Sequence, residues 1–137
     1  MASEAFVDTS GFYALLVQRD DMHGRAADAM KQAAATRMRL VTTDYVLDET
    51  STLLKARSLD HLVAQFFDTV FASEACRVEW MDPSRFAATR ARFLKHLDQR
   101  WSFTDCFSFE VMREHRLNAA WTKDEHFRQA GFEPLFV

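Results

Sequence analysis

Short apolar runs alternate with longer segments of helical periodicity along this chain. The apolar runs predict buried strands at residues 5–7, 38–42, 77–81, 118–122 and, at the end of the chain, 135–137. Between them, apolar residues recur at helical spacing and predict helices at residues 10–18, 24–36, 45–57, 59–72, 103–117 and 125–130. One more helix should begin at Asp82 and Pro83, with an inward apolar stripe made of Phe86, Phe93, Leu94 and Leu97.

The alternation of strands and helices indicates βαβ units and therefore a mainly parallel sheet. We predict a three-layer α/β fold, in which helices cover both faces of that sheet. Ligands of such folds bind beyond the carboxyl ends of the strands, so we expect the chemistry at that edge.

Composition narrows the class of protein. The 137 residues predict one domain, residues 1–137, because domains usually have about 100–200 residues. The longest apolar run, residues 12–17, is far shorter than the roughly 20 residues of a membrane span. Two cysteines form neither a disulfide framework nor a zinc pattern, and three scattered glycines do not form a nucleotide-binding loop. We therefore expect a reduced, cytoplasmic protein without a membrane segment.

Two acidic residues stand where predicted strands end. Asp8 follows the first strand and Asp124 follows the fourth. In a parallel sheet, both would lie on the crevice edge. Each could instead cap the helix that follows, because Asp is a favoured N-cap residue.

Two further acidic residues are expected to face inward from helices. Glu49 lies at the edge of the apolar stripe of the helix at residues 45–57, and Asp105 belongs to an inward stripe of the helix at residues 103–117. Asp105 also fits a capping box with Ser102, so a purely local role is the alternative for it.

Four inward carboxylates repel one another. Each close pair costs about 3–4 kcal/mol at an effective dielectric constant near 20. A marginally stable domain tolerates such repulsion only with raised pKa values or with a bound cation. Carboxylate oxygens select hard cations, so Mg²⁺ or Mn²⁺ is the expected cofactor, and acid clusters that hold these ions serve phosphoryl chemistry.

Four segments together resemble the motifs of PIN-domain ribonucleases, and most closely those of the VapC toxins of bacterial and archaeal toxin–antitoxin pairs. They are residues 6–10 (FVDTS), 46–50 (VLDET), 101–109 (WSFTDCFSF) and 122–127 (TKDEHF). The resemblance covers nearly the whole chain, in the order and spacing of the family.

The resemblance implies a metal-dependent endoribonuclease that hydrolyses RNA phosphodiester bonds as the toxin of such a pair. It implies a sheet of five parallel strands in the order 3-2-1-4-5. It also implies an RNA substrate, a cognate antitoxin and a homodimer as partners. The implied catalytic and metal-binding residues are Asp8, Glu49, Asp105 and Asp124, and the implied supporting hydroxyls belong to Thr9, Ser10 and Thr104.

Other families share part of the first motif. Aspartic proteases use an Asp-Thr/Ser-Gly motif similar to the segment at Asp8, but on an all-β scaffold. A haloacid-dehalogenase-like phosphatase would have a second Asp where Ser10 stands, and a receiver domain would have an acidic pair before Asp8. A non-catalytic RNA-binding or assembly module of the same fold is a further alternative, and metal dependence separates it from a nuclease.

The formal net charge of −3 repels RNA, so contacts with phosphate must be local. Arg100, just before the third motif, and Lys123 are the expected RNA-binding residues; the alternative is that both are solvated surface charges. The five histidines have no ligand spacing and are expected at the surface or at helix caps. His126, just after Asp124, is the one nearest the crevice.

The predicted helix at residues 59–72 has an apolar face of about 180°, whereas a core needs a stripe of about 100°. Either this helix is unusually well buried or part of its face binds another protein. We expect Phe67 or Phe71 at a contact between two chains of a homodimer, with a nearby groove for an antitoxin segment.

Overall fold

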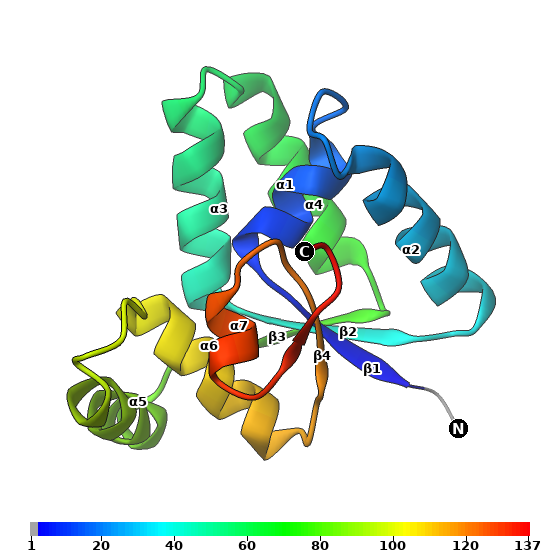
Figure 1. Ribbon diagram of the computed structural model, residues 1–137. Helices are drawn as coiled ribbons and strands as arrows, with labels where there is room; N and C mark the ends of the chain where they lie inside the picture. Colours follow the sequence, from blue (N-terminus) through cyan, green and yellow to red (C-terminus); the bar gives the residue numbers. More distant parts are fainter. Residues whose placement is uncertain (1–2) are drawn as a thin grey trace.

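A five-stranded parallel sheet forms the centre of the computed structural model, which describes residues 3–137 (Figure 1). Its strand order, β3-β2-β1-β4-β5, confirms the expected 3-2-1-4-5 arrangement. The strands are β1 (Glu4–Val7), β2 (Arg39–Thr43), β3 (Cys76–Glu79), β4 (Ala119–Trp121) and β5 (Glu133–Pro134).

Helices cover both faces of this sheet, as the alternating pattern predicted. Figure 1 shows α1 to α4 on one side of the strands and α5 to α7 on the other. The helices are α1 (Thr9–Leu16), α2 (His23–Ala35), α3 (Asp44–Ala56), α4 (Val63–Ala72), α5 (Pro83–Lys95), α6 (Phe103–Glu114) and α7 (His126–Gln129). None of the helices within residues 3–137 is long and apolar enough to cross a membrane.

The strand order reverses its direction between β1 and β4. The chain leaves β1 toward β2 on one face and later returns to β4 by way of the other face. This reversal opens a crevice at the carboxyl ends of β1 and β4, which is where ligands bind in open parallel sheets. The buried residues of the central strand β1 are all apolar, and Phe6 and Val7 among them are completely buried.

Gly11, in the first turn of α1, allows that helix to approach β4 closely. A Cβ atom at this position would lie 2.1 Å from the carbonyl oxygen of Trp121. No larger residue fits there without moving the backbone of one of the two elements. The close approach holds Asp8, which precedes α1, beside the carboxyl end of β4.

Two predicted elements differ from the structure by more than a shift of their ends. Residues 59–72 are not one helix, because residues Asp60–Leu62 form a 3₁₀ turn before α4 begins at Val63. The last strand is Glu133–Pro134 and not residues 135–137. Pro134 lacks an N–H donor, which an edge strand such as β5 tolerates.

The inward stripe predicted for α5 is wrong. The side chains of Phe86, Leu94 and Leu97 are exposed, and Leu97 lies beyond the end of α5. Only Phe93 is half-buried, with its ring 5.6 Å from that of Phe103. The reason is that α5 packs on α6 and not on the sheet, so it buries a narrow strip around Thr89.

Candidate active site

The two strand-end acidic residues meet at the crevice between β1 and β4. Asp8 is buried, and its Oδ2 accepts a hydrogen bond of 2.8 Å from the hydroxyl of Thr122. Asp8 occupies the N-cap position of α1, but its side chain makes no capping hydrogen bond. Its carboxylate is therefore not used for capping and is directed to the site.

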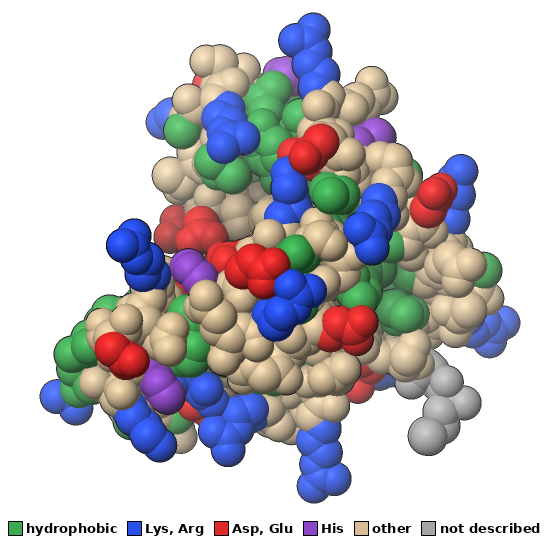
Figure 2. All heavy atoms as spheres, in the orientation of Figure 1, with side chains coloured by type: hydrophobic (Ala, Val, Ile, Leu, Met, Phe, Trp, Pro, Cys, Tyr) green, Lys and Arg blue, Asp and Glu red, His purple; other side chains and the backbone are tan. Residues whose placement is uncertain are grey.

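A cleft of about 450 Å³ opens at this edge of the sheet. Figure 2 shows acidic side chains and a histidine gathered near the middle of this face of the molecule. The acidic residues that line the cleft are Asp8, Asp20, Glu49, Asp124 and Glu125.

The side chain of Asp105 forms the predicted capping box and also contacts another residue of the candidate site. Its backbone N–H donates to the Ser102 hydroxyl at 3.0 Å, and its Oδ2 accepts from the backbone N–H of Ser102 at 3.0 Å. The predicted capping box is thus present. The same Oδ2 atom lies 3.0 Å from Nδ1 of His126, so the box also fixes the carboxylate beside that ring, although Asp105 is not among the residues that line the cleft.

His126 bridges two of the acidic residues, and the sequence did not predict this. Its Nδ1 lies 3.0 Å from Oδ2 of Asp105 and 3.3 Å from Oδ1 of Asp124. One side-chain ligand atom from each of these three residues lies within 4.8 Å of the others, which is close enough to share a metal ion. The only sequence signal was that His126 comes two residues after Asp124.

Burial and mutual repulsion raise the pKa of these carboxyl groups. Removal from water raises the pKa of Asp8 to about 7, and the charges of Asp105 and Glu49 add to it against the opposing hydrogen bond from Thr122. Burial also raises the pKa of Asp105, although hydrogen bonds from Ser102 and His126 oppose it. Within residues 3–137, no lysine or arginine lies within 4.0 Å of Asp8, Glu49, Asp105 or Asp124.

Glu49 reaches the cleft from α3, as the edge of its helical stripe indicated. Partial removal from water raises its pKa, a hydrogen bond with Thr9 lowers it, and the charges of Asp105 and Asp124 raise it. The residue as a whole is exposed. Among Asp8, Glu49, Asp105 and Asp124, Glu49 therefore has the freest access to solvent.

Hydroxyl groups hold the strand ends together. Thr122 donates to Asp8, its oxygen accepts from the backbone N–H of Asp124 at 3.0 Å, and it lies 3.1 Å from the hydroxyl of Ser10. Ser10 in turn accepts from the backbone N–H of Lys123 at 2.8 Å. Thr122, which our candidate residues did not include, thus lies at the centre of this network.

The other two predicted hydroxyls differ in position. Thr9 is buried at the cleft, and its Oγ1 accepts a hydrogen bond of 3.3 Å from Thr50. Thr104 is half-buried in the first turn of α6 and is not among the residues that line the cleft. Its backbone carbonyl accepts a hydrogen bond from Ser108.

The two predicted RNA-binding residues also differ in their position relative to the cleft. Lys123 lines the cleft, but its Nζ lies 2.6 Å from Asp21 and 3.3 Å from Asp20, which neutralise much of its charge. Arg100 is exposed in the loop before α6 and does not line the cleft.

Comparisons with known proteins agree with this architecture. The model of the PIN domain matches residues 5–133. This chain belongs to the PIN-domain family. The 23S rRNA-specific endonuclease VapC20 from two strains of Mycobacterium tuberculosis is 34% identical over 128 residues, which are 93% of this chain and 94% of the relative.

The crystal structure of Mycobacterium tuberculosis VapC20, described as a Sarcin-Ricin loop cleaving toxin, superposes on this PIN domain with a TM-score of 0.84. The two chains are 31% identical, and the alignment covers 98% of this chain and all of that chain. The predicted family and its resemblance to VapC toxins are therefore confirmed, and the parallel sheet excludes the all-β fold of an aspartic protease.

The raised pKa of Asp8 predicts how the stability of the metal-free protein depends on pH. The folded-state pKa of about 7 exceeds the ordinary 3.8, so stability from this group is full below about pH 4 and is lost as the pH rises to 7. Asp8→Asn does not ionise and should raise the free energy of unfolding at pH 8 by about 2–4 kcal/mol.

Urea unfolding at pH 4, 6 and 8 in EDTA measures this difference, which should shrink toward pH 4. Exposed Asp28 on α2 provides the matched control, and Asp28→Asn should change stability by less than about 0.5 kcal/mol. An Asp8→Asn variant that is less stable than the wild type at pH 8 would contradict the assignment.

Proposed function

We propose that this PIN domain is a metal-dependent endoribonuclease, the toxin of a toxin–antitoxin pair. The observation that carries the proposal is a group of acidic residues at the carboxyl ends of β1 and β4. Ligand atoms of Asp105, Asp124 and His126 lie within 4.8 Å of one another, and the charge of Asp105 acts on buried Asp8. No lysine or arginine among the described residues pairs with these carboxylates. The similarity to VapC20, a 23S rRNA-specific endonuclease, supports an RNA substrate.

The donor set fits a hard divalent cation. Carboxylate oxygens are the ligands that Mg²⁺ and Mn²⁺ prefer. Burial raises the pKa of Asp8 and of Asp105, and no lysine or arginine within residues 3–137 lies within 4.0 Å of either carboxylate. We propose that Asp8, Asp105 and Asp124 would hold Mg²⁺ or Mn²⁺, with Glu49 at the solvent side. Such an ion, when bound, would acidify water and offset negative charge on the phosphate.

The chain's own residues then have separate tasks. Thr122 holds the Asp8 carboxylate in place, and the Ser102 cap holds that of Asp105. Glu49, with its raised pKa and access to solvent, would orient the attacking water and take its proton. Attack of that water on phosphorus breaks the bond to the 3′ oxygen and leaves a 5′-phosphate and a 3′-hydroxyl.

Cleavage of RNA tests this function directly. Purified protein should cleave 23S rRNA with Mg²⁺ or Mn²⁺ and should not cleave it in EDTA. Asp8→Asn and Asp105→Asn should each lower the rate by about 1,000-fold, because a lost metal ligand removes several kcal/mol of transition-state stabilisation. Asp28→Asn should retain the rate of the wild type.

Full activity in EDTA would refute the metal-dependent mechanism. Binding of RNA without cleavage at any metal concentration would instead support a non-catalytic module of the same fold. Cleavage that leaves a 2′,3′-cyclic phosphate would contradict the role of water as the nucleophile.

We propose that the partner surface lies on α4 and the end of β3. Phe71 and Trp80 are 56% and 55% exposed, and their rings stack with centroids 6.3 Å apart. Together with half-buried Phe67 they line a groove of about 280 Å³ beside α3. We call these three residues the aromatic patch. Exposed aromatic residues of this kind are typical anchors of protein interfaces.

The aromatic patch predicts a homodimer in solution. Phe71→Ala should convert the dimer to a monomer, because it removes an exposed anchor without opening the core of one chain. Sedimentation at about 100 μM measures the change. Leu94→Ala, at an equally exposed apolar position on α5, is the control and should leave the dimer intact. A wild-type chain that is monomeric at this concentration would refute the prediction.

A further inference from the structure

The cleft continues beyond the carboxylates along the seam between α1 and α3. Thr9 and Tyr13 lie one turn apart on α1, and both line the cleft. Glu49 and Leu53 on α3 and its C-cap residue, Arg57, follow at four-residue steps, so they lie on one side of the helix. Since each step rises by about 6 Å, Arg57 lies about 12 Å along the wall from Glu49.

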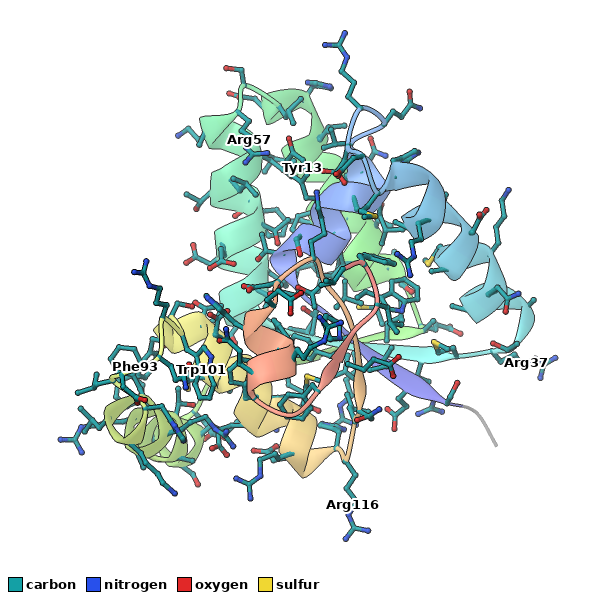
Figure 3. All side chains as sticks on the ribbon, viewed as in Figure 1. Tyr13, Arg37, Arg57, Phe93, Trp101 and Arg116 are labelled. Atoms are coloured by element: carbon teal, nitrogen blue, oxygen red, sulfur yellow. The ribbon has the colours of Figure 1, made fainter. Side chains whose placement is uncertain are left out.

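Arg57 and Tyr13 meet across this seam. The guanidinium carbon of Arg57 lies 4.8 Å from the centroid of the Tyr13 ring, which is within the range of a cation–π interaction. Figure 3 shows the two side chains pointing toward each other from α3 and α1. Arg57 caps the carboxyl end of α3, where a cation is favourable, but capping alone does not direct its side chain across to α1.

Arg57 also differs from the other cation of the cleft. Lys123 is paired with Asp20 and Asp21. Arg57 is exposed, and no carboxylate within residues 3–137 lies within 4.0 Å of it. Its planar guanidinium is therefore free to bind a phosphate through its edge while its outer face remains open to stacking.

We propose that Arg57 forms a nucleotide-binding subsite in the same cleft as the candidate reaction centre, with Tyr13 as the residue that positions it. An unpaired base of the RNA stacks on the outer face of the guanidinium, and the adjacent phosphate accepts hydrogen bonds from its edge. The substrate must then be single-stranded at this position, because a base inside a duplex does not expose its face. This assignment rests on the proposed ribonuclease function.

Steady-state cleavage of a single-stranded RNA of about eight nucleotides tests the subsite. Arg57→Ala should raise KM about 10-fold and leave kcat within about 2-fold, because the interaction is present before and during the reaction. Tyr13→Leu should raise KM to a similar extent, whereas Tyr13→Phe, which keeps the ring, should restore the wild-type value. Arg90→Ala, an exposed position on α5, controls for the loss of one positive charge.

A duplex of the same sequence separates stacking from general attraction to phosphate. Arg57→Ala should weaken binding of the duplex much less than binding of the single strand, because the duplex offers a phosphate but no exposed base face. An unchanged KM in Arg57→Ala, or a duplex that loses as much affinity as the single strand, would overturn the proposal. If the wild type does not cleave RNA at all, the proposed function fails. In that case, fluorescence anisotropy measures the affinity of the same variants for the same labelled RNA with Mg²⁺. This measurement tests the subsite independently of cleavage.

Discussion

The account of this domain depends on one constraint: carboxylates are removed from water and placed near one another without a lysine or arginine partner in the described structure. Burial raises the pKa of Asp8 to about 7, and it also raises the pKa of Asp105. A chain of marginal stability keeps such a cluster only if something else compensates for its cost. In the proposed function, a divalent cation would supply that compensation and also the chemistry of phosphodiester hydrolysis.

Interactions that stabilise the fold also orient the carboxylates of this site. The capping box of α6 fixes the direction of Asp105, and the hydroxyl of Thr122 joins the end of β4 to Asp8. Gly11 lets α1 approach the backbone of β4, which keeps the two strand ends together. The Ser102 cap is close in sequence to the residue it holds, whereas the contacts of Thr122 with Asp8 and of Gly11 with β4 join distant parts of the chain.

The sequence predicted the features that depend on local pattern. The strand ends at Asp8 and Asp124 and the cap at Ser102 follow from periodicity and N-cap chemistry, whereas the strand order came from the resemblance to a family. The bridge made by His126 was not predictable, because it depends on how α7 packs against α6. The pairing of Lys123 with the loop after α1 was missed for the same reason.

Anomalous diffraction from crystals soaked in Mn²⁺ above pH 7 tests the central claim most directly, since it locates the cation independently of activity. The account predicts an anomalous peak about 2.2 Å from carboxylate oxygens of Asp8, Asp105 and Asp124. A cleft without such a peak at saturating Mn²⁺, or a peak held only by other residues, would contradict it.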